Sequence, residues 1–251
     1  MNSNLTLIKM NSIDLTLKIT KKLGPVYKKV HGGYFGIFTA ILGILTVIVA
    51  SILFYSVEPF TMYSHWISNL GGVETNSGKS PNGSNLVFSI GLITMSVTSV
   101  IFVLYLVNLL LSSKNQKFPR LVVCCLIFGV LSLLGNVGIA FFDMKSQPML
   151  HVYSAIVLFV SLTFTIFFFS ISMFFNKDVS KIQAIIGLIV IIITLILFAS
   201  FLPLMLEGYD LLTLMTSTSS ELAITRFWEW MSFFAFLSWF FELGVYTLKF
   251  K

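Results

Sequence analysis

The chain has 251 residues, of which 57% are apolar and only 10% charged, and its mean hydropathy is +0.94. A soluble domain would carry about 25% charged residues, so the composition excludes an ordinary soluble protein and predicts an integral membrane protein. The net charge of +6 does not indicate nucleic-acid binding, because the basic residues lie in connecting segments and form no patch with exposed aromatic residues. We therefore expect membrane lipids as partners, expect no nucleic acid, and leave protein partners open.

Continuous apolar runs recur along the chain, each longer than the ~18 residues that a membrane-crossing helix needs. Barrel strands would alternate polar and apolar residues, and these runs do not. The sequence predicts an all-α integral membrane protein with six transmembrane helices in one bundle, and a helix satisfies its own backbone hydrogen bonds in lipid. The expected helices span residues 34–57, 86–111, 121–142, 151–175, 182–206 and 227–248.

The segments outside the helices divide the chain further. Residues 1–33 are expected to form a basic cytoplasmic segment, in which residues 12–22 could lie on the membrane as a short amphipathic helix. Residues 58–85 and 207–225 are the two longer polar loops, and the first contains the N-glycosylation sequon Asn82-Gly-Ser84. The chain closes with a short tail, 249–251. We expect the Ile- and Leu-rich helix at 182–206 to be the most exposed to lipid.

The distribution of basic residues predicts the orientation. Thirteen of the 16 Lys and Arg residues lie in the N-terminal segment, the second and fourth connections and the tail, whereas Lys79, Lys145 and Arg226 lie on the other side. By the positive-inside rule both termini are expected in the cytoplasm of a multi-pass cell-membrane protein. The loops at 58–85 and 207–225 are then extracytoplasmic.

This topology gathers polar side chains from three segments on the outer side. The candidate ligand-binding residues are Ser64, His65, Asn69, Asp143, His151, Arg226, Trp228 and Glu229. The guanidinium of Arg226, beside an aromatic pair at 228 and 230, could hold an anionic head group. The alternative is an ion pair between Arg226 and Glu229, three residues apart on one helix.

Two catalytic interpretations were weighed against simpler ones. His65, His151 and Asp143 could bind a divalent metal that activates water, but no HxxxH or HExxH spacing supports a metal site. The simpler interpretation is that Asp143 caps its turn and that His151 donates to a backbone carbonyl. A Ser64–His65–Asp143 triad is weaker still, because adjacent residues seldom hold nucleophile and base in the needed geometry.

Other polar and small residues are expected within the helices. Asn136 and Glu242 are the intramembrane polar residues, each expected to make a hydrogen bond between helices, Glu242 with Asn108 or Tyr105. Small residues at 129, 132, 135 and 138 predict a face that packs closely against a neighbour. The adjacent Cys124 and Cys125 have no metal or redox spacing and are expected to be core thiols.

Short motifs carry a resemblance to a known family. Ile67-Ser-Asn-Leu-Gly71, Asn85, Phe142-Asp143, His151 and Arg226 resemble a prokaryotic and archaeal six-helix membrane family of unknown function, the domain-of-unknown-function 998 type. That family is distantly similar to the Frag/DRAM/Sfk superfamily of autophagy-modulator and GPI-anchor-remodelling proteins. The resemblance covers residues 34–248 and implies six helices and an outward polar cluster. The chain departs from the pattern of that family at Asn69, where an acid is common.

These observations favour one function and leave two others open. The leading hypothesis is a membrane protein that binds a lipid or other amphiphile at an outer polar pocket, with no cofactor and no metal. The alternatives are a metal-dependent membrane hydrolase using His65, His151 and Asp143, and a non-catalytic scaffold or sensor. The sequence does not decide whether the protein is an enzyme, and it favours a non-catalytic role.

Overall fold

The computed structural model describes residues 14, 16, 18, 22 and 24–250, and every regular element in this part of the chain is helical. The expected amphipathic segment at 12–22 lies mostly outside the described residues. The helices are α2 (Gly24–Lys29), α3 (Gly33–Tyr55), α4 (Ser84–Ser112), α5 (Pro119–Phe141), α6 (Pro148–Phe174), α7 (Lys181–Leu206), α8 (Leu211–Thr216) and α9 (Ala223–Thr247). Two short 3₁₀ helices, η1 (Ile67–Gly71) and η2 (Ser220–Leu222), lie in the longer loops.

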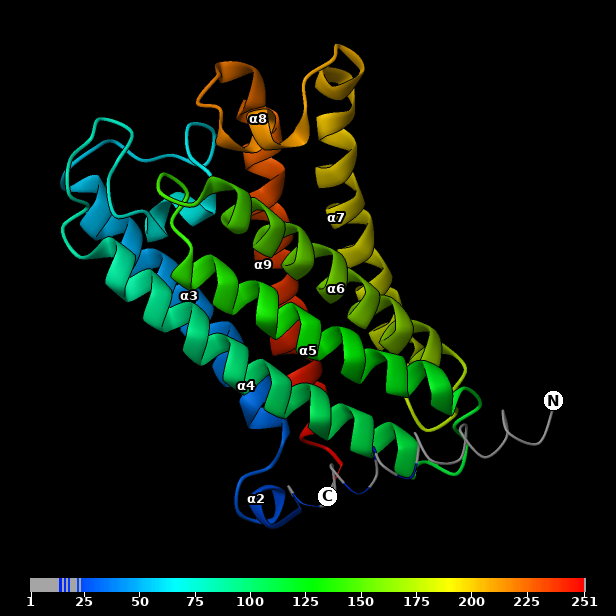
Figure 1. Cartoon of the computed structure of the whole chain (residues 1–251). Coiled ribbons are helices and arrows are strands. Elements are labelled where there is room, and N and C mark those ends of the chain that lie inside the picture. The colour runs from blue at the N-terminus through cyan, green and yellow to red at the C-terminus, as the bar shows by residue number, and fades with distance from the viewer. Residues whose placement is uncertain (1–13, 15, 17, 19–21, 23, 251) are drawn as a thin grey trace.

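The long helices form an up-and-down bundle in which each helix contacts the next, and α9 closes the circuit by packing against both α3 and α7 (Figure 1). One end of the bundle, here called the loop end, carries residues 56–83, 142–147 and 207–222. The opposite end, here called the turn end, carries residues 24–32, 113–118, 175–180 and 248–250. All-helical architecture is therefore confirmed.

Helix α9 supplies most of the centre of the bundle. Its aromatic side chains at 230, 233, 236, 239 and 240 are buried, and the rings at 236, 239 and 240 lie about 6 Å from rings on α6 and α4. The centroid distances are 5.8 Å for Phe159–Phe236, 6.0 Å for Phe169–Trp239 and 6.1 Å for Phe102–Phe240. These contacts make α9 the spine against which the other helices pack.

Glycines set how closely the helices approach. A Cβ at Gly135 would lie 2.5 Å from the backbone nitrogen of Leu158, and one at Gly138 would lie 2.2 Å from the Ser154 hydroxyl. Helices α5 and α6 therefore meet nearly backbone to backbone, as the small residues of 129–138 predict.

Five helices in the described part of the chain are long and apolar enough to cross a membrane: α3, α4, α5, α6 and α7. Among these, α7 is the least buried, with 28% of its most apolar window inside the structure, which agrees with the expected lipid exposure of residues 182–206. Helix α9 has 25 residues, but Arg226, Glu229 and Glu242 lower its hydropathy, and it is not among the five. The sixth crossing therefore stays a prediction.

Two predicted contacts within the helices are wrong. Glu242 has Gln183 of α7 as its polar neighbour, and no hydrogen bond joins it to residue 105 or 108 within the described chain. The Tyr105 hydroxyl instead lies 3.0 Å from His31 Nε2. The side chain of Asn136 lines a small, mostly apolar cavity and makes no hydrogen bond to any described residue.

The turn end is held by hydrogen bonds between neighbouring turns. His31 Nε2 donates to Phe250 O at 2.7 Å, and its Nδ1 accepts from Gly33 N at 3.1 Å. The Ser113 hydroxyl donates to Asp178 Oδ2 at 2.6 Å. The His31–Phe250 and Ser113–Asp178 bonds join segments that are close in space but distant in sequence, so neighbouring turns are tied together in pairs.

Candidate functional site

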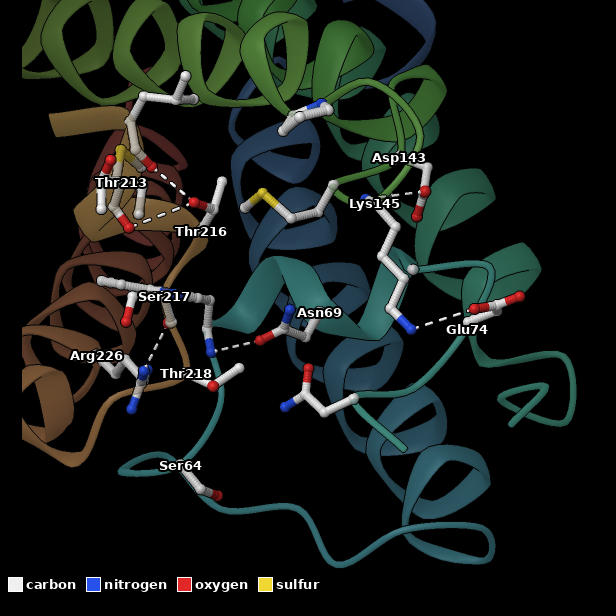
Figure 2. A pocket seen from close by; sticks show the side chains of 17 residues that line it. Ser64, Asn69, Glu74, Asp143, Lys145, Thr213, Thr216, Ser217, Thr218 and Arg226 are labelled. Atoms are coloured by element: carbon white, nitrogen blue, oxygen red, sulfur yellow. Dashed lines mark hydrogen bonds and ion pairs between the residues drawn. The ribbon is translucent and has the colours of Figure 1, made fainter. Parts of the chain in front are cut away.

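A cavity of about 470 Å³ lies at the loop end (Figure 2). Its walls come from residues 64–76, from the turn 143–148, from residues 212–218 and from Arg226 of α9. The loop after α3, the turn between α5 and α6 and the start of α9, which the sequence predicts to lie on the same side, therefore do meet at one cavity. Its lining mixes hydroxyl, amide and charged groups with apolar side chains, which is the composition of a site that orients a ligand.

The start of α9 fixes the wall formed by residues 63–67. Glu229 Oε2 accepts a hydrogen bond from Ile67 N at 2.8 Å, and Trp230 Nε1 donates to His65 O at 3.1 Å. The Arg226 guanidinium donates to Tyr63 O at 3.3 Å and to Ser217 O at 2.8 Å. One turn of helix thus positions two loops through their backbone atoms, and loop side chains remain free to face the cavity.

Asn69 shapes the same loop from within. Its side-chain oxygen accepts from Trp66 N at 2.8 Å and so caps η1, while the residue also lines the cavity. The amide of Asn69 therefore serves as a cap without adding negative charge.

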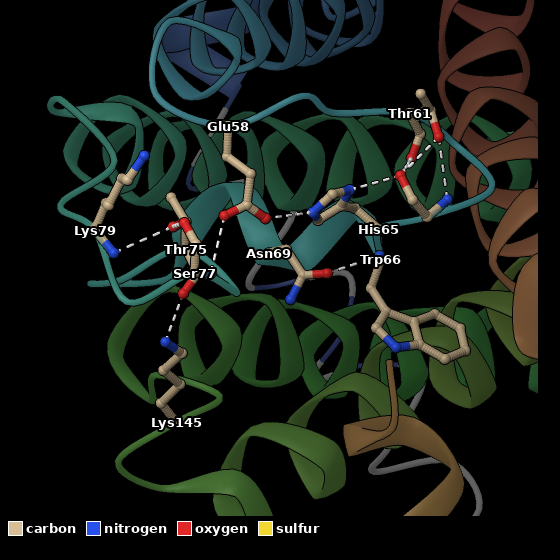
Figure 3. Close-up of polar contacts among 10 residues, drawn as sticks. Glu58, Thr61, His65, Trp66, Asn69, Thr75, Ser77, Lys79 and Lys145 are labelled. Atoms are coloured by element: carbon tan, nitrogen blue, oxygen red, sulfur yellow. Dashed lines mark hydrogen bonds and ion pairs between the residues drawn. The ribbon is translucent and has the colours of Figure 1, made fainter. Parts of the chain in front are cut away.

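Three side chains of the first loop, Ser64, His65 and Glu58, form a chain of consecutive hydrogen bonds (Figure 3). Glu58 Oε1 lies 3.2 Å from His65 Nε2, and His65 Nδ1 lies 2.8 Å from the Ser64 hydroxyl. Burial would raise the pKa of Glu58, but hydrogen bonds from Ser77, Thr75 and His65 outweigh it and lower that pKa to about 2. Burial also lowers the pKa of His65, more than its contact with Glu58 raises it.

These shifts assign the protons in the chain. An ionised Glu58 accepts from Nε2–H of a neutral His65, so Nδ1 is the nitrogen that accepts from the Ser64 hydroxyl. The Ser64–His65–Asp143 triad, the weakest of the interpretations considered, is not assembled, because the acid beside His65 is Glu58. The N–H groups of Ser64 and His65 both donate to Thr61 O, so neither can stabilise an oxyanion, and we interpret the chain as an anchor for the loop.

The turn between α5 and α6 is organised by Asp143. Its carboxylate accepts from Val73 N at 3.1 Å, from Lys145 N at 3.0 Å and from Ser146 N at 2.8 Å. Burial acts to raise the pKa of Asp143, but these backbone donors prevail and lower it. Asp143 therefore caps its own turn and also ties that turn to the first loop, 70 residues away in sequence.

Lys145, from the same turn, spans one side of the cavity. Its ammonium group donates to Glu74 Oε2 at 3.2 Å and to Thr75 O at 2.5 Å. The charge of Lys145 is therefore balanced by an acid within the cavity wall.

Four of the predicted ligand-binding residues line the cavity, and four do not. Ser64, Asn69, Asp143 and Arg226 line it, whereas His65, His151, Trp228 and Glu229 lie outside its lining. His151 is buried, with Nδ1 donating to Phe142 O at 2.6 Å, so the simpler of its two interpretations describes its contact. The predicted aromatic partners of Arg226 are wrong, because its guanidinium stacks 5.4 Å from the ring of Trp66.

The structure does not assemble the predicted metal site. Within the described residues no three His, Cys, Asp or Glu side chains gather closely enough to hold a metal ion. His65, His151 and Asp143 are each turned to a different partner, as described above. The metal-dependent hydrolase therefore lacks the arrangement of ligands that motivated it.

The charge of Arg226 is the main electrostatic feature of the cavity. Arg226 is only 1% exposed, and its two terminal nitrogens donate to uncharged carbonyls. Its Nε has no partner in the part of the chain that the structure describes, and no described carboxylate lies within 4.0 Å, so the expected ion pair with Glu229 is wrong. A buried cation without a counterion is costly, and an anionic ligand would offset that cost.

Sequence reasoning missed the wall at 212–218. It described this stretch only as a Thr/Ser-rich loop, but Asp210 begins the short helix α8 by accepting from Thr213 N at 2.9 Å. The signal was present, because an Asp directly before an apolar run is a helix N-cap pattern. Helix α8 then presents Thr213 and Thr216 to the cavity.

Comparison with known proteins adds a family to this geometry. No curated protein and no solved structure matches the chain. The family DUF998, whose members are described as proteins of unknown function, matches residues 40–246, a range that runs from α3 to α9 and includes all four walls of the cavity. The chain therefore belongs to the DUF998 family of proteins of unknown function.

Proposed function

We propose that this protein crosses the membrane six times, with both termini in the cytoplasm, and that its loop-end cavity binds a lipid or other amphiphile by an anionic head group. The observation that carries the proposal is a cavity of about 470 Å³ lined by the buried guanidinium of Arg226, which has no carboxylate within 4.0 Å among the described groups. Sites for small molecules span about 300–1,000 Å³, so a head group fits.

The other charged groups of the cavity already have partners within the chain. Lys145 pairs with Glu74, and the carboxylate of Asp143 accepts three backbone N–H groups. The net attraction for a ligand therefore comes from Arg226, whose planar guanidinium matches phosphate oxygens. The Thr218 hydroxyl supplies a further donor for a phosphate, whereas the Thr213 and Thr216 hydroxyls already donate to Asp210 Oδ2 and Leu212 O.

The proposed topology supports the same ligand. Helix α9 packs against α3 and α7, two helices suited to crossing a membrane, which supports a sixth crossing. The loop end then lies at the outer interface, where lipid phosphates are found.

An impermeant maleimide tests this topology on intact cells. In a chain with Cys124 and Cys125 replaced by Ala, cysteines at Asn76 and Thr218 should react, and those at Lys114 and Lys249 should not. Reaction at Lys249 would contradict the sixth crossing.

Native mass spectrometry of gently extracted protein tests binding. The probes are phosphatidylglycerol and, as a control without phosphate, diacylglycerol with the same chains. We expect wild type to retain phosphatidylglycerol in preference. Thr216→Trp fills the cavity and should reduce retention about tenfold, whereas Ser80→Trp, an equally exposed substitution outside the lining, should have no effect.

A second variant addresses the charge. Arg226→Gln keeps a donor for one carbonyl but removes the cation, so it should abolish the preference for phosphatidylglycerol over diacylglycerol. Equal retention of both probes by wild type, or unchanged retention in Thr216→Trp, would overturn the proposal.

A further inference from the structure

We propose that the ligand is an outer-leaflet phospholipid that reaches the loop-end cavity sideways, with one acyl chain lying in the groove between α6 and α7. This inference rests on the proposed function and adds the path and the class of lipid. The occupant is a chain of the surrounding bilayer, because the groove is apolar and lies between two helices suited to crossing a membrane.

Three hollows of the structure are linked by shared walls. The loop-end cavity shares Trp66 and Met215 with a narrow apolar cavity of about 40 Å³ between α6, α7 and α9. That cavity in turn shares Phe198 with an apolar groove of about 320 Å³ along α6 and α7. The polarity therefore falls steadily from the head-group cavity to the lipid-facing groove, as it does along a phospholipid.

Two buried donors mark the junction between the polar and apolar parts. Trp66 is 4% exposed and lines both cavities, yet its indole Nε1 has no hydrogen-bond partner within the described chain. The guanidinium of Arg226 stacks 5.4 Å from the same ring, and its Nε is unpartnered among those residues too. Leaving a buried donor unpaired is unfavourable, so acceptor oxygens are expected here. The ester and phosphate oxygens of a phospholipid occupy this position between head group and chains.

The arrangement of helices provides the opening. Helices α6 and α7 diverge toward the loop end, and the short helix α8 lies between them and contacts both (Figure 1). The neck of about 40 Å³ admits only a few methylene groups, so it takes the start of one chain and the groove takes the rest. The stacking of Trp66 on Phe201, at 6.0 Å between ring centroids, forms the wall of this neck.

Photocrosslinking in lipid nanodiscs tests the path. The nanodiscs contain phosphatidylcholine and a phosphatidylglycerol with a diazirine in its acyl chain, and crosslinked peptides are mapped by mass spectrometry. We expect labelling of residues 160–167 of α6 to exceed that of the lipid-facing residues 127–134 of α5 several-fold. Leu195→Trp fills the groove and should reduce this excess several-fold, whereas Leu134→Trp on α5 should not; the two leucines are 54% and 56% exposed.

Retention of dihexanoyl-phosphatidylglycerol separates the path from the head-group site, because its chains are too short to fill the groove. Leu195→Trp should leave this retention unchanged, and Thr216→Trp should reduce both readouts. Even labelling of α5 and α6, or a Leu195→Trp variant labelled like wild type, would overturn the acyl-chain path while the head-group site stands. If wild type does not retain dihexanoyl-phosphatidylglycerol, both the acyl-chain path and the head-group site are overturned.

Discussion

At the turn end of the bundle, polar side chains from neighbouring turns bond to one another, whereas at the loop end buried donors border a cavity. His31, Ser113 and Asp178 find their partners on adjacent turns. Trp66 and Arg226 keep unpartnered N–H groups beside a hollow of about 470 Å³. The difference is that the unpartnered donors of the loop end border a cavity, which supports the ligand proposed above.

The largest expected contrast comes from two aspartates, one at each end. Asp143→Ala removes the acceptor of three backbone N–H groups and should lower the free energy of unfolding by about 1.5–3 kcal/mol. Asp178→Ala removes bonds at a solvent-exposed site and should have a much smaller effect. Thermal unfolding of both variants in the same detergent measures the difference, and equal losses would contradict it.

A pair of serines gives a smaller effect of the same kind. The buried Ser84 hydroxyl donates to Leu70 O at 2.8 Å, so Ser84→Ala should lower stability by about 1–2 kcal/mol. Ser113→Ala, at the partly exposed turn end, should lower it by about 0.5 kcal/mol. Hydrogen exchange should show faster opening near Leu70 in the first variant, and an unchanged rate there would refute the anchoring role of this bond.

The smallest effect is a dependence on pH confined to the loop end. Because the folded pKa of His65 lies below its ordinary 6.5, the unfolded chain binds the proton more readily, and stability is lost as pH falls below about 6.5. Glu58, with a folded pKa of about 2 against 4.5, adds a loss only below about pH 4.5.

Hydrogen exchange of residues 58–77, corrected for intrinsic rates, should therefore rise between pH 7.5 and 5.5. In His65→Gln the rise should disappear. If exchange still rises at low pH in that variant, the titrating group is not His65.

Much of the fold could be predicted from the sequence, because uninterrupted apolar runs have few alternatives in lipid. Long helices occupy each of the six predicted ranges, and the small residues of α5 do pack against α6. The meeting of Asp143 and Arg226 at one cavity followed from helix count alone.

Side-chain partners could not be predicted, because they depend on rotations and loop paths that no periodicity encodes. Arg226 stacks on Trp66, a residue 160 positions away, and His65 turns to Glu58 across its own loop. Helix α8 was missed as a wall because six residues give too short a pattern to reveal which way they face.

The clamp formed by Arg226, Glu229 and Trp230 has a consequence for biosynthesis. The N–H of Ile67 lacks its acceptor until Glu229, 162 residues later in the chain, has been synthesised. During translation the first loop is therefore synthesised long before its anchor, and the cavity wall at 63–67 is completed only after α9 has been made. Chains truncated before α9 should remain in the membrane as immature bundles that quality-control proteases can recognise.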